Sequence, residues 1–461
     1  MKKKLFAGLL ASLLLFQAMG NVSQAVKIVE VPTEEVESVY NQAIDSNKLK
    51  NWPEGPHIYS ESGIVMDMDT GSVLYGKKID DKHYPASITK VLTALVSLEN
   101  CELDSVVKHS RDDVLNLESG ATHIGIKENE EISMKDALYA ILLASANEVS
   151  NGIASNFPGG YDAFVEEMNA TARELGCENS NFMNPHGLHH DEHYTTAYDM
   201  ALISAAAFQN ETFQKITSTK QYTIGKTNIT KEERTFQQKH KMLNSGSHHY
   251  EYCVGGKTGY TTKSLNTLVT FATKGNMNLV AVVIRTHGGN SHAYEDTKKI
   301  LDYAFENFQK RPVQVPEIAH NGIAAMGKQA FLTLPNQMLP VMFSSYVGTY
   351  EDPTELGDKT GIARYTYDGW KIGNVEYIIS DMRYREIHNI EEPSIEPPKS
   401  QKKDKTSNVV WIVLIILVIV LLGVVGLFLY VEQKRKELEK VRKERRKKIL
   451  EEWEKNRTSD E

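Results

Sequence analysis

The chain has 461 residues, about three times the roughly 150 residues of a typical domain, so we expect two or more domains. Its 52 Lys and Arg against 60 Asp and Glu give a net charge of −8, which argues against a nucleic-acid-binding protein that relies on phosphate contacts. Charged residues at 24% and hydrophobic residues at 41% exclude a disordered or collagen-like chain, and three cysteines exclude a disulfide scaffold.

The N-terminus has the layout of a secretory signal peptide. Three lysines at 2–4 precede an apolar run at 5–19, and small residues before Ala25 suit a signal peptidase. We expect residues 1–25 to be cleaved and residues 26–51 to form an N-terminal extension. A retained anchor is the less favoured alternative, because the run is short for a membrane span of about 20 residues.

Residues 52–310 mix strand and helix patterns and are predicted to form a large domain of the α/β (α+β) class. Residues 62–75 alternate in polarity around an Asp-Thr-Gly turn, which is typical of a β-hairpin. Residues 87–99 have the apolar spacing of a buried helix. The β-rich runs 265–272 and 278–285 are joined by a short turn, so we expect them to pair as antiparallel strands.

The C-terminal third predicts a different organisation. Residues 311–390 contain alternating stretches and an Asp-Gly turn, which indicates a small β-rich domain. Residues 391–408 are rich in Pro, Ser and Lys and are predicted to be a linker. Residues 409–431 carry no charge and are long enough for a transmembrane helix. The strongly basic residues 432–461 should then lie in the cytoplasm, leaving the bulk of the chain outside.

Ser87 and Lys90 form the first candidate catalytic pair. Residues three apart on a helix are neighbours on one face. Serine is a weak nucleophile until a base lies beside it, and a lysine can be that base where burial or a nearby cation lowers its pKa. Ser-x-x-Lys also occurs at Ser105 and Ser400, so the pattern alone is weak. Only the copy at Ser87 opens a strongly apolar helix.

Two further polar motifs follow along the chain. Ser145 and Asn147 belong to a Ser-Ala-Asn triplet at the end of an apolar helix, and a Lys-Thr-Gly triplet starts at Lys257 before the paired strands. Copies of these patterns at Ser264 and Lys359 show that each triplet alone is weak evidence. The three motifs in this order, at a helix start, a helix end and a strand, are much more specific.

This ordered set is that of β-lactamases and penicillin-binding proteins. The surrounding sequence resembles the low-molecular-mass penicillin-binding proteins that act as serine-type D-Ala-D-Ala carboxypeptidases. Residues 62–99 look like their hairpin and nucleophile helix, residues 184–200 like their loop-and-helix segment, and residues 255–261 like their Lys-Thr-Gly strand. The resemblance runs from about residue 52 to 310. It implies a β-lactamase/transpeptidase-like domain with a central antiparallel sheet and a helical lobe.

The resemblance also implies a mechanism without a cofactor. Ser87 would attack the terminal D-Ala-D-Ala bond of a peptidoglycan pentapeptide and form an acyl-enzyme that water hydrolyses. Lys90 would be the general base. Ser145 would relay a proton to the leaving amine, and Asn147 would orient Lys90 and the substrate amide. β-Lactam antibiotics would acylate the same serine.

The Lys-Thr-Gly strand would bind the other end of the substrate. Lys257 and Thr258 would bind its terminal carboxylate, and Gly259 would let the strand approach the ligand. The backbone N–H groups of Ser87 and Tyr260 would form the oxyanion hole. Arg285 is a second candidate contact to the carboxylate, and a structural surface charge explains it equally well.

The histidines offer a competing metal site. His186, His189, His190 and His193 occupy one loop, but no cysteine or carboxylate completes a recognisable ligand set, so polar loop residues are the favoured interpretation. The cysteines are most simply unpaired, with one disulfide as the alternative.

Three alternative functions stay open. A class A-like β-lactamase needs a deacylating glutamate, and Glu166 lies in what reads as an ordinary amphipathic helix. A transpeptidase would use the same acyl-enzyme with an amine acceptor. A membrane-tethered interaction protein with a decayed site is disfavoured by the intact motifs.

Overall fold

The computed structural model describes residues 33–312, 323–325, 331–337, 347–352 and 357–390. The expected signal peptide, linker, transmembrane helix and basic tail lie outside these residues. Within the described ranges, no helix combines the length and the apolar character that a membrane span requires.

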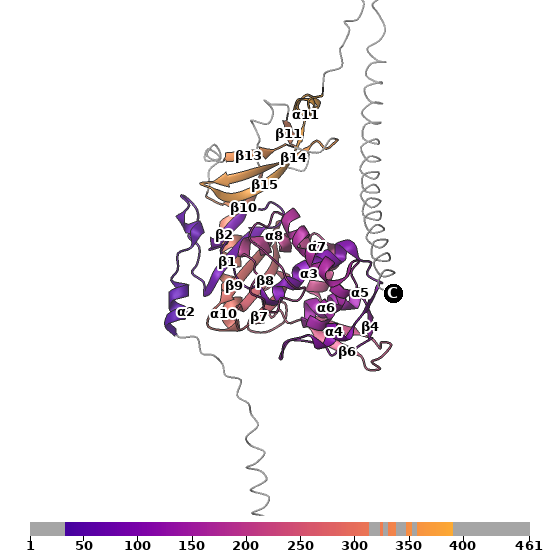
Figure 1. Ribbon diagram of the computed structural model, residues 1–461. Coiled ribbons are helices and arrows are strands. Elements are labelled where there is room, and N and C mark those ends of the chain that lie inside the picture. Colours follow the sequence, from indigo (N-terminus) through magenta and orange to yellow (C-terminus); the bar gives the residue numbers. More distant parts are fainter. Residues whose placement is uncertain (1–32, 313–322, 326–330, 338–346, 353–356, 391–461) are drawn as a thin grey trace, which may run out of the picture.

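A five-stranded antiparallel sheet forms the centre of the larger part of the molecule (Figure 1). Its order is β2-β1-β9-β8-β7, so the N-terminal hairpin joins the later strands through the pairing of β1 with β9. The hairpin predicted at 62–75 and the predicted pairing of 265–272 with 278–285 are confirmed. The strands are β1 Ser60–Asp67, β2 Val73–Lys77, β7 Cys253–Thr261, β8 Leu265–Lys274 and β9 Met277–Thr286.

Hydrophobic cores cover both faces of this sheet. On β9, Val280 and Val282 pack into the core that includes α8 (Ala197–Phe208), whereas Ala281 and Val283 pack into the core that includes α10 (Asn290–Asn307). Alternate residues of a strand point to opposite faces, so a strand covered on both sides is apolar throughout. Helix α10 (Asn290–Asn307) thus covers one face and the helical lobe the other. The predicted α/β class with a central antiparallel sheet is confirmed.

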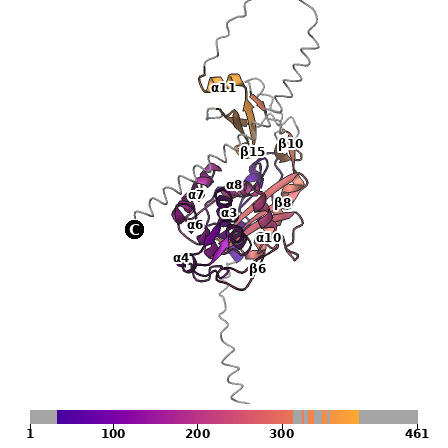
Figure 2. The ribbon, with the colours of Figure 1, turned by 90° about the vertical axis from the view of Figure 1, so that its right-hand side faces the viewer.

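The helical lobe lies beside the sheet (Figures 1 and 2). Two short two-stranded sheets belong to this part, β3 Val106–Lys108 with β4 Glu131–Ser133, and β5 Gln221–Ile224 with β6 Arg234–Gln237. The helices before α10 are α2 Thr33–Tyr40, α3 Lys90–Asn100, α4 Arg111–Leu115, α5 Met134–Tyr139, α6 Asn147–Ser155, α7 Gly160–Glu174, α8 Ala197–Phe208 and α9 Glu211–Ser218. All three cysteines are free thiols.

Two local departures from regular helix occur at motif residues. The helix predicted from Ser87 begins with a 3₁₀ turn, Ala86–Thr89, and becomes α-helical only at Lys90. The apolar helix before Ser145 ends in a π-helical turn, Ala140–Ala144. Single π turns are rare in proteins, and those that do occur are often found at functional sites.

A smaller β-rich part follows α10. A four-stranded sheet has the order β11-β15-β14-β13, and β10 pairs separately with β12. The Asp368-Gly369 turn joins β14 to β15 with both residues at positive φ, as a type I′ hairpin turn requires. The elements are β10 Phe308–Pro312, β11 Ile323–Ala325, β12 Phe331–Pro335, β13 Val347–Glu351, β14 Thr360–Tyr367, β15 Trp370–Ile379 and α11 Asp381–Ile387.

Buried hydrogen bonds tie this part to the β1–β2 hairpin. Thr333 Oγ1 donates to Asp67 Oδ2 at 2.8 Å, and Trp370 Nε1 donates to the carbonyl of Val73 at 2.8 Å. These contacts fix the β-rich part at the hairpin end of the sheet.

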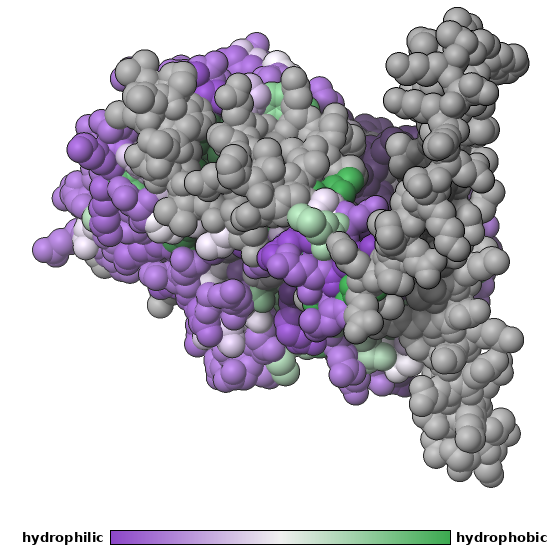
Figure 3. Space-filling model, turned by 90° about the horizontal axis from the view of Figure 1, so that it is seen from above, coloured by the Kyte–Doolittle hydropathy of each residue, from purple (hydrophilic) through white to green (hydrophobic). Residues whose placement is uncertain are grey.

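Seen from above, the described surface is mostly hydrophilic with small separate hydrophobic patches (Figure 3).

Candidate active site

A cavity of about 550 Å³ is lined by residues from the helical lobe and from the edge strand β7. Lys90 and Lys257 are buried and hydrogen-bonded to serines on its wall. The structure thereby brings together all the predicted site residues except Arg285. The predicted residues that line the cavity are Ser87, Ser145, Asn147, Thr258, Gly259 and Tyr260.

Ser87 lies in a strained turn that neighbouring side chains hold in place. Ala86 has a φ of +51°, a conformation that costs a non-glycine residue about 1 kcal/mol or more. Thr89 Oγ1 donates to the carbonyl of Ala86 at 2.9 Å, and Thr267 Oγ1 donates to the carbonyl of Pro85 at 2.9 Å. The turn leaves Ser87 half-buried on the cavity wall.

Lys90 is fully buried beside this serine. Its Nζ lies 3.2 Å from Ser87 Oγ, 2.7 Å from Asn147 Oδ1 and 2.7 Å from the carbonyl oxygen of His186. Burial, and after it the charge of Lys257, holds the pKa of Lys90 well below its ordinary value. The two carbonyl-type oxygens can only accept hydrogen bonds. When the amine is neutral, it can donate its two N–H groups to these oxygens and keep its lone pair for the Ser87 hydroxyl.

Lys257 makes the matching arrangement with the second serine. Its Nζ donates to Ser145 Oγ at 3.1 Å and to the carbonyl of Thr258 at 2.7 Å. Burial, and after it the charge of Lys239, lowers the pKa of Lys257 to about 7. Ser145 ends the π turn in a left-handed conformation with φ of +63°. At neutral pH Lys257 is close to half-protonated, so it can hold or release a proton next to Ser145.

Gly259 brings β7 against the backbone of the nucleophile. A Cβ atom at this position would lie 2.9 Å from the backbone nitrogen of Ser87 and 2.3 Å from Thr267 Oγ1. The strand and the Ser87 amide can approach this closely only because residue 259 has no side chain. The side chain of Tyr260, the next residue, is 63% exposed.

The structure does not bring Arg285 into the cavity. Its Nε donates to Glu61 Oε1 at 2.7 Å and its Nη1 to the carbonyl of Lys263. Glu61 is half-buried, and despite that burial the His287 and Arg285 side chains lower its pKa to about 2. This ion pair, formed between β1 and the end of β9, occupies the guanidinium.

The histidine-rich loop contributes hydrogen bonds rather than a ligand set. His193 is buried and lies 3.0 Å from Thr89 Oγ1 through Nε2, while its Nδ1 accepts from the backbone N–H of Met183 at 3.1 Å. His186 is also buried, and its carbonyl accepts from Lys90. Among the residues that the structure describes, no three His, Cys, Asp or Glu side chains gather as metal ligands would.

Two charged residues on the cavity wall escaped the sequence analysis. Lys239 lies between β6 and β7, and Glu118 lies in the loop after α4. Neither belongs to a recognisable motif, and nothing in the sequence separates Lys239 from Lys241, two positions away. Only the path of the folded chain identifies them.

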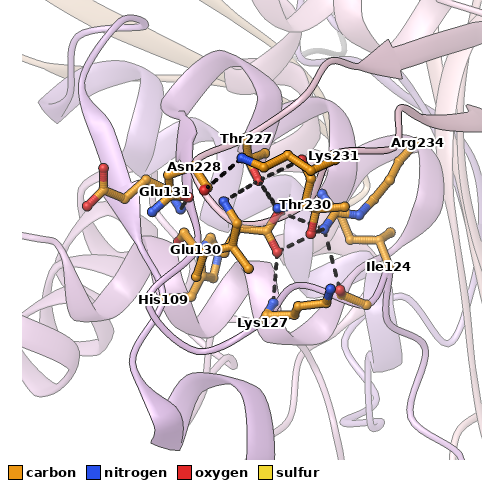
Figure 4. A network of polar contacts seen from close by, with 12 residues as sticks. His109, Ile124, Lys127, Glu130, Glu131, Thr227, Asn228, Thr230, Lys231 and Arg234 are labelled. Atoms are coloured by element: carbon orange, nitrogen blue, oxygen red, sulfur yellow. Dashed lines mark hydrogen bonds and ion pairs between the residues drawn. The ribbon is translucent and has the colours of Figure 1, made fainter.

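A second cluster of charged and polar groups holds the lobe beside the cavity (Figure 4). Glu130 is fully buried and accepts hydrogen bonds from Arg234 Nη2 at 2.7 and 2.8 Å, from Thr227 Oγ1 at 2.6 Å and from the backbone N–H of Lys127 at 2.9 Å. We call Glu130, Arg234, Thr227 and Lys127 the Glu130 cluster. It ties the loop between β5 and β6 to the segment before β4.

Comparison with known proteins agrees with the geometry. A sequence model of the D-alanyl-D-alanine carboxypeptidase family matches residues 49–288. The chain is 32% identical over 282 residues to D-alanyl-D-alanine carboxypeptidase DacF of Bacillus subtilis, covering 60% of this chain and 70% of that protein. It is 28% identical over 357 residues to D-alanyl-D-alanine carboxypeptidase DacA of Escherichia coli, covering 71% of this chain and 84% of that protein.

Among solved structures, the Streptomyces K15 DD-transpeptidase is similar, with a TM-score of 0.51 and 27% sequence identity. That similarity covers 55% of this chain and 100% of the other.

Proposed function

Because this chain belongs to the D-alanyl-D-alanine carboxypeptidase family, a family of serine hydrolases, we propose that it removes the terminal D-alanine of peptidoglycan stem peptides through an acyl-enzyme on Ser87. The observation that carries the proposal is the contact between the Ser87 hydroxyl and Lys90, which is buried and has a lowered pKa. That contact supplies the base without which a serine is a poor nucleophile.

In the acylation step, Ser87 Oγ bonds to the carbonyl carbon of the penultimate D-alanine while its proton passes to Lys90 Nζ. The negative charge that develops on the carbonyl oxygen is bound by the backbone N–H groups of Ser87 and Tyr260. The C–N bond then breaks, and the leaving nitrogen takes a proton through Ser145. The products are a Ser87 ester and free D-alanine.

Water attacks the ester in the second step, with Lys90 again accepting the proton and the Ser87 oxygen recovering one as it leaves. Asn147 fixes Lys90 and donates to the substrate amide. Lys257, Thr258 and Gly259 receive the carboxylate end of the peptide along β7.

β-Lactam antibiotics should acylate Ser87 and remain bound. Deacylation in a class A-like β-lactamase needs a glutamate beside the ester, and Glu166 is the candidate in the sequence. It lies within helix α7 and is not among the residues that line the cavity. A long-lived adduct is therefore favoured over antibiotic turnover.

Transfer of the acyl group to an amine is the second candidate activity, since a similar structure is named a DD-transpeptidase. The same ester serves both reactions, so the acceptor alone separates them.

For location, we propose export by the signal peptide and anchoring by residues 409–431, with the catalytic part facing the cell wall.

The decisive experiment labels the protein with a fluorescent penicillin, maps the adduct by peptide mass spectrometry, and follows D-alanine release from a pentapeptide. We expect one adduct, on Ser87, and loss of both signals in Ser87→Ala. Ser105→Ala, in another Ser-x-x-Lys copy, is the matched control and should behave as wild type. An adduct on another residue, or none, would refute the assignment.

A further inference from the structure

Three lysines act electrostatically on the catalytic centre, and two of them are engaged within it. Lys90 is bonded to Ser87 and Asn147, and Lys257 is bonded to Ser145. Burial lowers the pKa values of both, as it also does for Lys239, but the N–H groups of Lys90 and Lys257 already donate to protein oxygens, so neither offers a free ammonium to the substrate. A substrate carboxylate therefore needs another cation.

Arg285 does not supply that cation, because its guanidinium is paired with Glu61 and it does not line the cavity. Lys239 does line it, together with Thr258 and Tyr294. In the part of the chain that the structure describes, the Lys239 ammonium has no hydrogen-bond or ion-pair partner. Its positive charge is close enough to lower the pKa values of both buried lysines.

The backbone around Lys239 is fixed by its neighbours. Gln238 Nε2 donates to the carbonyl of Thr217 at 3.0 Å, and His240 Nε2 lies 2.9 Å from Thr270 Oγ1 on β8. Both flanking side chains are buried, whereas Lys239 between them is exposed. The alternation presents Lys239 at the cavity from an anchored segment rather than from a free loop.

We propose that Lys239 binds the terminal carboxylate of the substrate together with Thr258, leaving Lys257 to serve the proton relay at Ser145. The inference rests on the proposed function and assigns carboxylate binding to Lys239 instead of Lys257. The carboxylate can reach Thr258 and the Lys239 ammonium in the same cavity, and within the described residues this ammonium is not paired with any protein group. An ammonium beside a carboxylate forms a charge-assisted hydrogen bond, stronger than one between neutral groups.

This assignment makes a free C-terminal carboxylate a specificity requirement. A peptide that ends in an amide presents the same scissile bond without the charge, so Lys239 contributes nothing to its binding. The residue should therefore act on affinity more than on chemistry, because it does not touch the reacting atoms.

The test compares Lys239→Ala and Lys239→Arg with wild type on two peptides, one ending in D-Ala-D-Ala and the other in D-Ala-D-alaninamide. We expect Lys239→Ala to lower kcat/KM for the acid about 10-fold to 100-fold, mainly through a raised KM, and to leave the amide rate within about twofold. Lys239→Arg should restore most of the loss. Thermal unfolding is followed in parallel to verify that each variant is folded.

Lys241→Ala is the matched control, because it removes a lysine only two residues away. The Lys241 side chain lies over the Tyr294 ring and does not line the cavity. It should leave both substrates unaffected. Equal losses on acid and amide in Lys239→Ala, or no loss on either, would overturn the inference while wild-type activity keeps the proposed function intact. Absence of D-alanine release by the wild type would instead reject the proposed function.

Discussion

The active-site cavity and the Glu130 cluster both contain buried charged side chains, but only the Glu130 cluster pairs them with opposite charges. Glu130 receives the Arg234 guanidinium and two further donors. Lys90 and Lys257, in contrast, lie next to serines and carbonyl oxygens, and no carboxylate in the described residues forms an ion pair with either.

This difference separates a cluster that stabilises the fold from a cavity that supports catalysis. A buried charge is tolerable where hydrogen bonds and an opposite charge replace its hydration. The buried lysines gain nothing of this kind for stability, but burial and the charge of Lys257 lower the pKa of Lys90, which favours the neutral amine that a general base requires. The lobe is held by a buried ion pair with additional hydrogen bonds, whereas the lysines of the cavity have hydrogen bonds but no opposite charge beside them. We expect substitutions in the two regions to have opposite effects on activity and stability.

The largest effect is expected for Lys90→Met, a similar shape without the amine. Loss of a general base should lower D-alanine release and penicillin acylation about 100-fold to 10,000-fold. Stability should change less than in the control below, because relief of the desolvated lysine offsets the loss of the hydrogen bonds to Asn147 and the carbonyl of His186. Steady-state kinetics and thermal unfolding measure both quantities.

Lys77→Met provides the matched control for this prediction. Lys77 is equally buried, but its Nζ donates to the carbonyls of Val39, Ile58 and Ser60 at 2.8 to 3.0 Å. Removing it strands three acceptors, so stability should fall while the folded fraction keeps its activity. Normal acylation by Lys90→Met would show that another group is the base.

A smaller effect is expected for Glu130→Gln, on stability. The change keeps the shape but removes the charge opposite Arg234, and breaking a buried pair costs about 3 kcal/mol. Burial by itself raises the pKa of Glu130, but the hydrogen bonds from Thr227 and Arg234 together lower it in the folded protein, so its stabilising contribution is present above pH 4.5 and disappears as pH falls through the lowered value.

Chemical denaturation of Glu130→Gln from pH 3 to pH 7 should therefore show a weaker pH dependence than wild type. The double variant Glu130→Gln/Arg234→Met should recover part of the loss, because it no longer leaves the guanidinium unpaired. Wild-type stability at pH 7 would contradict the structural role of the cluster. A loss of activity in the folded variant would contradict the division between the two regions.

The contrast also explains how far the sequence could predict the site. Ser87, Lys90, Ser145 and Lys257 could be found because each motif has a fixed spacing and a local context, such as the start of an apolar helix. The two sheet pairings were predictable from alternation and turn residues.

Other features depend on contacts between distant segments and leave no local signature. The π turn before Ser145 reads as ordinary helix in the sequence. Arg285 and Lys239 are both cations next to strands, and only the position of Glu61 on the paired strand β1 shows which of them is already engaged. Likewise, Glu130 and Arg234 are 104 residues apart, and no periodicity connects them.

The smallest expected effect, taken per pH unit, is the pH dependence of stability contributed by Lys257. Its pKa is about 7 in the folded protein and 10.5 for an exposed lysine, so between these values the unfolded chain binds more protons than the folded one. Stability should therefore rise with pH across this window, by up to about 1.4 kcal/mol per pH unit from this one group.

Lys257→Met removes that titration. Denaturation between pH 7 and pH 9 should show a flatter curve than in wild type, together with higher stability at pH 7. Lys241→Ala, which removes an exposed lysine, should leave the slope unchanged. If Lys257→Met kept the wild-type slope, Lys257 would be fully protonated in the fold, and it could not exchange a proton with Ser145 near neutral pH. The cavity would then resemble the Glu130 cluster, with a fixed charge rather than a titrating one.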